Sequence, residues 1–324
     1  MNILVTGCAG FIGYHLCKKI LFENDHKVIG VDNLNKYYDV NLKNDRLKIL
    51  KSSKNFKFKK KDIMNFDSLN DVFKLYKIDI IINLAAQAGV RDSINKPQNY
   101  FNFNMQGFFN ILELARLHEI KHLLYASSSS VYGLQKKFPI MENYETSEPN
   151  SFYAATKKCN EIMAHSYSAI HKIPCTGLRF FTVYGPYGRP DMALFKFVKS
   201  FFSGKKIDLY NNGDHIRDFT YIDDIVNPLY LLINKKPKEA IPHKIYNLAS
   251  SNPISLKKFI NEIEKNLKSI LKKNKMPLQQ GDIHKTYASI KKLKKDTGYK
   301  IIFDYKKGIK EFINWYIEYY GTNK

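Results

Sequence analysis

A glycine-rich turn near the start of the chain constrains the fold more than any other feature of the sequence. An apolar run, residues 3–5, leads into Gly7, and the stretch after Gly10 has the character of a helix. The three glycines follow a GxxGxxG spacing, which permits a tight turn, a close approach of backbone to a pyrophosphate and close packing of helix on strand. The helix N-terminus also offers free N–H groups to phosphate. We therefore expect Gly7, Gly10, Phe11, Ile12 and Gly13 to bind a dinucleotide.

The first half of the chain alternates short β-branched runs with longer helical stretches. Strands are expected at 3–5, 27–32, 55–60, 78–84, 122–126 and 175–180, and helices at 11–22, 67–77, 99–118 and 152–171. This alternation predicts an α/β fold, a Rossmann-type doubly wound parallel sheet with helices on both faces. Residues 1–180 would form the cofactor-binding domain, together with about 215–235. Residues 181–324 would form a smaller mixed α/β substrate-binding domain, with helices at 256–273 and 308–320.

Composition excludes several classes of protein. A chain of 324 residues with 44% hydrophobic residues can bury a sizeable core. The net charge is +22, but only six of the 52 basic residues are Arg and the lysines are scattered, which favours a solvated surface over a nucleic-acid interface. There is no uncharged apolar run of 18 residues and no basic leader before an apolar segment, so neither a membrane span nor a signal peptide is expected. Cys8, Cys17, Cys159 and Cys175 lack metal-ligand spacing, which predicts free thiols in a reducing cytoplasm and no metal site.

Two acidic residues at predicted strand ends bear on the choice of cofactor. Asp32 follows Gly13 by 19 residues, and a carboxylate there accepts hydrogen bonds from both adenosine ribose hydroxyls and repels a 2′-phosphate. This favours NAD over NADP. Asn33, the residue after Asp32, is expected to bind the cofactor as well. Asp62 and Ile63 follow the end of the third strand and can reach the adenine edge, although a plain strand-end role for Asp62 stays open.

A tyrosine, a lysine and a serine run supply the chemistry. Tyr153 and Lys157 stand at i and i+4 on one predicted helix, where an ammonium can lower the pKa of a phenol. Residues 127–130 are four consecutive serines at the end of a predicted strand, about 25 residues upstream. Hydroxyls at that edge of an α/β sheet can bind a sugar hydroxyl and share its proton with Tyr153.

Together these motifs resemble those of extended short-chain dehydrogenases/reductases, specifically the NAD-dependent sugar-nucleotide epimerase family, and most of all UDP-glucuronate 4-epimerases. The resemblance spans residue 1 to about 320. It is carried by residues 7–13, 32–39, 83–91, 126–133, 153–157, 185–193 and 217–224. The chain departs from the family pattern at Cys8, where Ala is usual, and at Asn83, where His is usual.

The resemblance implies roles for individual residues. Ser128, Tyr153 and Lys157 match the catalytic positions, and Leu84, Ala85 and Ala86 join Tyr153 and Lys157 at the cofactor. The substrate positions are Ser129, Ser130, Thr182 and Arg189 at the sugar and its carboxylate, Arg217 at the UDP phosphates, Arg91, and Gln279 and Asp282 near the uridine. Three of the six arginines fall in these motifs, and a guanidinium pairs bidentately with carboxylate or phosphate as lysine cannot.

The expected activity is therefore 4-epimerisation of UDP-glucuronate to UDP-galacturonate through a 4-keto intermediate. The alternatives are a UDP-glucose or UDP-N-acetylglucosamine 4-epimerase, a UDP-glucuronate decarboxylase and a nucleotide-sugar 4,6-dehydratase. Dehydratases of this group usually place an Asp-Glu pair where this chain has Ser129 and Ser130. A non-catalytic NAD-sensing scaffold is disfavoured because Ser128, Tyr153 and Lys157 are all present. The family also implies a cytoplasmic homodimer that pairs through 99–118 and 152–171, and a role in polysaccharide supply.

Overall fold

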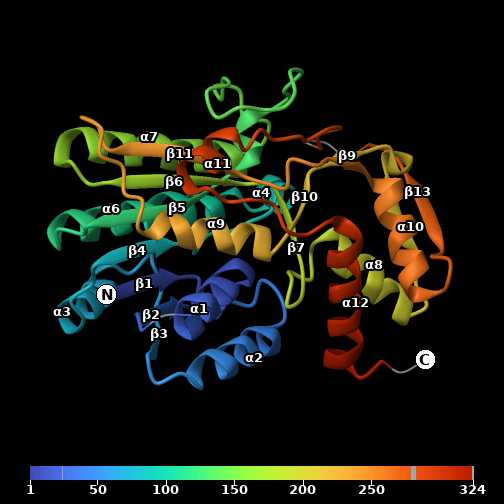
Figure 1. Cartoon of the computed structure of the whole chain (residues 1–324), viewed down its shortest axis with the longest axis horizontal. Helices are drawn as coiled ribbons and strands as arrows, with labels where there is room; N and C mark the ends of the chain where they lie inside the picture. The colour runs from blue at the N-terminus through green and yellow to red at the C-terminus, as the bar shows by residue number, and fades with distance from the viewer. Residues whose placement is uncertain (24, 279–281, 323–324) are drawn as a thin grey trace.

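The computed structural model describes residues 1–23, 25–278 and 282–322, and a parallel sheet of seven strands forms its centre (Figure 1). The strand order is β11-β6-β5-β4-β1-β2-β3. The strands are β1 (Asn2–Thr6), β2 (Lys27–Asp32), β3 (Phe56–Lys60), β4 (Ile80–Asn83), β5 (His122–Ser128), β6 (Cys175–Phe180) and β11 (His243–Leu248). The doubly wound parallel sheet that the sequence predicts is thus confirmed. The strand order reverses between β1 and β4, and such sheets bind ligands outside the carboxyl ends of the strands at that point.

Hydrophobic side chains alternate between the two faces of the sheet and build a core on each. In β1, Ile3 and Val5 belong to one buried cluster and Leu4 belongs to the other. The first face is covered by α1 (Phe11–Glu23), α2 (Val40–Lys51) and α9 (Asp223–Ile233). The second is covered by α3 (Phe66–Leu75), α6 (Gly107–Leu117) and α7 (Phe152–His171). Helices on both faces leave only the strand ends for ligands.

The long helix predicted at 99–118 is divided into three parts. It consists of α5 (Pro97–Tyr100), a π-helical segment η1 (Phe101–Gln106) and α6. The Asn160 side chain on α7 donates to the Asn104 carbonyl in this segment at 2.7 Å. π-Helical segments occur frequently at functional sites, and η1 lines the pocket described below with Phe103.

The C-terminal half contributes elements to the central sheet and to a separate group of helices. The strand β11 pairs with β6, and α9 packs against α1. Figure 1 shows α8 (Ala193–Phe202), α10 (Leu256–Leu267) and α12 (Tyr305–Tyr320) together to one side of the sheet. The remaining elements are α4 (Val90–Asn95), η2 (Ser129–Tyr132), β7 (Thr182–Tyr184), β8 (Ile207–Tyr210), η3 (Asn211–Gly213), β9 (Ile216–Arg217), β10 (Phe219–Tyr221), β12 (Ile254–Ser255), β13 (Lys273–Met276) and α11 (Lys291–Thr297).

The helix predicted at 256–273 was too long. The helix α10 ends at Leu267 because Lys268 adopts the left-handed conformation, with φ of 51°. The following residues turn back, and β13 pairs in parallel with β8. A run of lysines fits a solvated helix and an exposed edge strand equally well, so the sequence did not mark this boundary.

Candidate active site

The glycine turn after β1 brings two backbone segments into contact at the carboxyl end of the sheet. Gly7 has a φ of 71°, and a Cβ atom on it would lie 2.8 Å from the backbone nitrogen of Ala85. A Cβ atom on Gly13 would lie 2.1 Å from the Gly7 carbonyl oxygen, so α1 packs directly against the turn. Only glycine fits both positions. Gly7, Gly10, Phe11, Ile12 and Gly13 all line one pocket.

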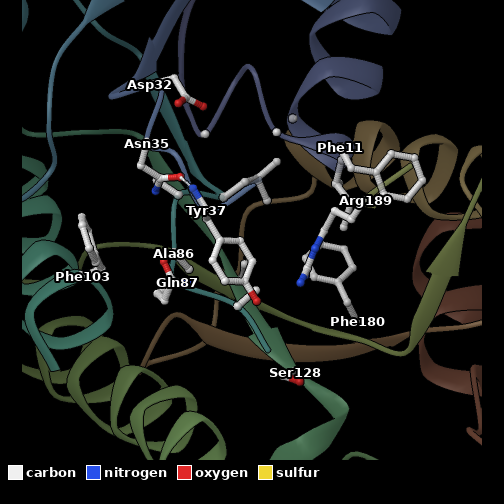
Figure 2. A pocket seen from close by; sticks show the side chains of 18 of the residues that line it. Phe11, Asp32, Asn35, Tyr37, Ala86, Gln87, Phe103, Ser128, Phe180 and Arg189 are labelled. Carbon is white, nitrogen blue, oxygen red and sulfur yellow. Dashed lines mark hydrogen bonds between the residues drawn. The ribbon is translucent and has the colours of Figure 1, made fainter. Parts of the chain in front are cut away.

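Asp32, the last residue of β2, lies at one end of this pocket (Figure 2). Its Oδ2 accepts a hydrogen bond from the Ala9 amide at 3.2 Å, and its Oδ1 accepts one from the Leu34 amide at 2.8 Å. Burial raises the pKa of this carboxyl, while the Leu34 N–H and the Lys43 ammonium oppose the rise. The carboxylate is fixed beside the glycine turn, and this arrangement fits the ribose of a dinucleotide.

Asn33 and Asp62 form a pair between the ends of β2 and β3. Asn33 Nδ2 donates to Asp62 Oδ2 at 2.8 Å, and the Met64 amide donates to Asp62 Oδ1 at 2.9 Å. Asn33 and Ile63 line the pocket. The Asp62 carboxylate therefore has a structural role at the end of β3, which is one of the two roles that the sequence left open. Its contact with adenine stays a prediction.

The loop after β4 is held by side chains from two other elements. Thr6 Oγ1 donates to Asn83 Oδ1 at 2.6 Å and accepts from the Ala85 amide at 3.2 Å. The Asn104 side chain accepts from the Gln87 amide at 2.8 Å and donates to the Gln87 carbonyl at 3.0 Å. These bonds fix the loop next to the glycine turn. Leu84, Ala85 and Ala86 line the pocket, as the sequence predicts.

The predicted catalytic residues come together from β5 and α7. Ser151 caps α7, with its Oγ accepting from the Ala154 amide at 3.1 Å. The cap places Tyr153 in the first turn and Lys157 one turn later, on the same face. Both line the pocket together with Ser128, the last residue of β5.

The electrostatics of this group differ from the sequence-based expectation. Burial raises the pKa of Tyr153, and the opposing influences are hydrogen bonding with Ser128 and the charge of Arg189. Lys157 donates instead to the Ala126 carbonyl at 2.9 Å, and burial lowers its pKa to about 8. Arg189 is thus a cation that favours the phenolate in this structure.

A buried ion pair between Arg179 and Glu161 supports the end of β5, where the serine run begins. Arg179 donates from Nε and Nη2 to the two carboxylate oxygens of Glu161 at 2.7 and 2.8 Å. Glu161 Oε1 also accepts from Ser127 Oγ at 2.6 Å. Both charged side chains are buried, and bidentate pairing is the geometry that offsets their desolvation. The end of β5 is thereby fixed before Ser128.

Arg189 lines the same pocket from the loop after β7. Figure 2 shows Tyr37 and Arg189 between Asp32 at one end and Ser128 at the other. The guanidinium donates to both carboxylate oxygens of Asp191. The negative charge of Asp191 raises the pKa of Arg189 against the effect of burial, so the side chain stays a cation.

The other predicted sugar-binding residues, Ser129, Ser130 and Thr182, do not line the pocket that the described residues form, but directly follow residues that do or lie close to them. Ser129 and Ser130 follow Ser128 in η2, and the Ser130 amide donates to Ser128 Oγ at 3.1 Å. Thr182 begins β7, directly after Phe181, which does line the pocket.

A second cluster brings together Arg217 and Asp282, both predicted at the nucleotide end, and Arg91, predicted to bind the substrate. Asp282 accepts from Arg217 Nη2 at 2.9 Å, and its other oxygen lies 3.5 Å from Arg91 Nη2. The Arg91 guanidinium stacks over the Tyr210 ring at 4.6 Å. Burial lowers the pKa of Arg217, and Asp282 opposes this. Gln279 lies outside the described residues.

Sequence reasoning missed several residues that line the pocket. They are Val31, Asn35, Tyr37, Tyr38, Lys43, Lys61, Gln87, Ala88, Phe103, Ala126, Ser127, Phe180, Phe181, Val183 and Met192. Asn35, Tyr37 and Tyr38 lie in the 32–39 stretch that carries the family resemblance, and their place directly after Asp32 could have found them, because a chain that leaves a strand at a ligand-binding edge crosses the ligand. The sequence also missed His215, which is buried beside Asp282.

The described residues contain no group of three or more His, Cys, Asp or Glu side chains placed to hold a metal ion. Within the same residues, no helix has the length and hydrophobicity that crossing a lipid bilayer requires.

Comparison with known proteins gives a consistent result. Residues 3–249 match the model of the NAD dependent epimerase/dehydratase family. Protein CapI of Staphylococcus aureus is 47% identical over 335 residues, with 99% of both chains covered. A probable UDP-glucuronate 4-epimerase of Rhizobium meliloti is 42% identical, with 99% of this chain and 98% of that protein covered.

A solved structure agrees along nearly the whole chain. The crystal structure of UDP-glucuronic acid 4-epimerase from Bacillus cereus, in complex with UDP-glucuronic acid and NAD, superposes with a TM-score of 0.92. It is 31% identical, and the match covers 99% of this chain and 100% of that one. The chain belongs to the NAD dependent epimerase/dehydratase family.

Proposed function

We propose that this protein inverts C4 of UDP-glucuronate to give UDP-galacturonate, with NAD as its cofactor. The observation that carries the proposal is the position of Arg189, which lines the same pocket as Ser128, Tyr153 and Lys157. A guanidinium beside the proton-transfer groups suits a sugar that carries a carboxylate. The names of the Rhizobium meliloti and Bacillus cereus relatives support the same substrate.

Tyr153 and Ser128 move the proton in this scheme. Tyr153, as phenolate, removes the proton of the 4-hydroxyl, and Ser128 bridges the two oxygens. NAD, when bound, would supply the redox chemistry at C4: removal of the C4 hydrogen as hydride and its return to the opposite face of the sugar. Between these events the 4-keto sugar turns over in the pocket, and Tyr153 then returns the proton. The glycine turn, Asp32 and Lys157 would hold the cofactor.

The carboxylate of the sugar needs to be restrained because the intermediate is a β-keto acid. Such an acid loses CO₂ when its C–CO₂⁻ bond aligns with the carbonyl π system. Thr182, Ser129 and Arg189 would hold the carboxylate out of that alignment, so positioning suppresses a side reaction. Ser130 would contact the sugar as well. At the nucleotide end, Arg217 and Arg91 would meet the diphosphate, and Asp282 and Gln279 would lie near the uridine.

The other activities of the family are less well supported. A neutral sugar such as UDP-glucose or UDP-N-acetylglucosamine would leave the Arg189 cation without a partner from the substrate. A decarboxylase requires the alignment that Arg189 would oppose. A 4,6-dehydratase requires an acid and a base where this chain has Ser129 and Ser130.

The assembly and setting belong to the same proposal. We propose a homodimer that pairs through α6, α7 and the segment before α6, because Phe101, Phe109 and Ile162 expose 48%, 42% and 57% of their surfaces there. A cytoplasmic location accords with four cysteines that are all free thiols. A role in polysaccharide supply rests on the family resemblance. We also propose that residues 1–180 and about 215–235 act as the NAD domain and that 181–324 hold the UDP-sugar.

A panel of three substrates tests the proposal. The purified protein is incubated separately with UDP-glucuronate, UDP-glucose and UDP-N-acetylglucosamine, and the products are identified by NMR. We expect UDP-galacturonate from the first and little turnover of the other two. Turnover confined to a neutral sugar would overturn the substrate, and a UDP-pentose as main product would identify a decarboxylase.

A further inference from the structure

Arg46 on α2 is fully buried and does not line the pocket, yet it contacts two of the loops around it, the glycine turn and the loop that carries Arg189. Its Nη1 donates to the Ala9 carbonyl in the glycine turn at 2.7 Å, and to the Tyr38 hydroxyl at 2.7 Å. Its Nη2 donates to the Tyr187 carbonyl at 2.6 Å and to the Gly188 carbonyl at 3.3 Å. One guanidinium thus joins the cofactor turn to the loop that carries Arg189.

The hydrogen bonds of Arg46 indicate that its role is to hold the backbone of these two loops in place. All of the acceptors that the described residues offer it are uncharged oxygens, namely carbonyls and a phenol. Its Nε is buried without a hydrogen-bond partner among the described residues. Burying a cation among such acceptors is costly. An apolar side chain would suit this position better if packing alone were needed.

The loop that carries Arg189 is also held from α1. His15 Nε2 lies 2.9 Å from the Pro186 carbonyl oxygen, and burial lowers the pKa of His15 to about 3, so a neutral ring donates this bond. Tyr187 adopts a φ of 54°, a conformation that a tyrosine holds only when its surroundings enforce it. Its ring packs between Tyr14 at 5.1 Å and Trp315 at 5.0 Å. The backbone next to Arg189 is therefore held by α1 and α12 as well as by Arg46.

We infer that Arg46 is a positioning residue that fixes the Arg189 loop to the cofactor turn and so sets where the Arg189 guanidinium meets the substrate. Arg189 lies two residues beyond Tyr187, so a shift of the Tyr187 backbone moves the guanidinium with it. The substrate part of this inference rests on the proposed function, since it assigns the sugar carboxylate to Arg189. The link that Arg46 makes between the two loops does not depend on the proposed function.

Arg46→Lys is the informative variant because it keeps the charge and most of the volume. One ammonium cannot span both loops as the fork does. We expect kcat/KM for UDP-glucuronate to fall about 10- to 100-fold, because a misplacement of a binding group by about 1 Å can lower the rate about 10²-fold. In an Arg189→Ala background the same exchange should change kcat/KM less than twofold, because the residue it positions is gone. Lys48→Arg, on the exposed face of α2, is the matched control and should leave activity unchanged.

Amide hydrogen exchange of the purified holoprotein tests the link without any substrate. Exchange across residues 185–192 should be faster in Arg46→Lys than in the wild type, while exchange in β4 and β5 stays the same. Unchanged exchange in this loop would overturn the link. Equal losses of kcat/KM in the wild-type and Arg189→Ala backgrounds would overturn the positioning role. If the wild type does not turn over UDP-glucuronate, the proposed function fails and the exchange result still decides on Arg46.

Discussion

Arg189 donates from Nε and Nη2 to the two carboxylate oxygens of Asp191, at 3.0 and 2.5 Å. The cation that we propose for the sugar carboxylate is therefore already oriented by a carboxylate of its own chain. This pairing occupies one edge of the guanidinium and leaves the Nη1 donors for other acceptors. Asp191 also keeps the partly buried side chain charged.

Removal of the Arg189 charge should affect charged and neutral sugars differently. A charge-assisted hydrogen bond contributes about 1.5–3 kcal/mol, so Arg189→Ala should lower kcat/KM for UDP-glucuronate about 10- to 150-fold. UDP-glucose, which has no carboxylate, should be affected little. Arg189→Lys should recover part of the loss because it restores the charge without the fork. Equal losses on both sugars would show that Arg189 supports the loop instead.

Tyr153→Phe keeps the ring and removes the proton carrier. Loss of a general acid–base group typically lowers the rate about 10²- to 10⁴-fold, and we expect kcat to fall by that amount. The NAD content and the thermal midpoint should stay close to wild type, because the phenyl ring keeps its packing. Both are measured on the same preparation, and near-normal turnover would mean that another group transfers the proton.

Asp32→Ala should weaken the binding of NAD and relax discrimination against NADP. The substitution removes the ribose partner and also the acceptor of the Ala9 and Leu34 amides, so the glycine turn loses part of its support. The nucleotide released on denaturation identifies the cofactor, and the wild type should release NAD or NADH. Release of NADP from the wild type would contradict the role of this carboxylate.

Acid should destabilise the protein through buried neutral histidines. Burial lowers the pKa of His122 to about 4, below the ordinary value of 6.5. Its two ring nitrogens form hydrogen bonds with the Ile233 carbonyl oxygen and with Thr176 Oγ1. Between those pH values the unfolded chain binds a proton that the folded chain does not, so the free energy of unfolding falls as pH decreases.

The His122 contribution can be isolated by substitution. His122→Asn removes one group that takes up a proton on unfolding. It should therefore lower the slope of the unfolding free energy with pH by up to about 1.4 kcal/mol per pH unit. Urea unfolding between pH 7 and 4.5 measures it, with His171→Asn, at an exposed position, as the control. An unchanged slope in His122→Asn would show that His122 is not the group concerned.

Local signals sufficed for much of the fold. The helix over 152–171 has the bounds that the sequence predicts, because Ser151 caps it and Lys172 ends it in the left-handed conformation. The strand at 175–180 is likewise as predicted. Buried parallel strands are continuous apolar runs, so they stand out in a Lys-rich chain.

Long-range and polar features could not be predicted. The helix α2 has a polar sequence and buries Lys43 and Arg46, which no hydrophobic periodicity reveals. The pairing of Arg91 and Arg217 with Asp282 joins three distant segments, and only the fold brings them together. The glycine turn, Asp32 and the catalytic residues were found because a motif names them, whereas Arg46 lies outside the pocket and belongs to no motif.

Transfer of deuterium from C4-deuterated UDP-glucuronate tests the central claim most directly. The holoprotein is incubated with this substrate without added cofactor, and the products are followed by NMR. Our account predicts UDP-galacturonate that keeps the deuterium at C4, since the same hydrogen leaves one face of the sugar and returns to the other. Formation of UDP-galacturonate with hydrogen from solvent at C4, or no UDP-galacturonate at all, would contradict it.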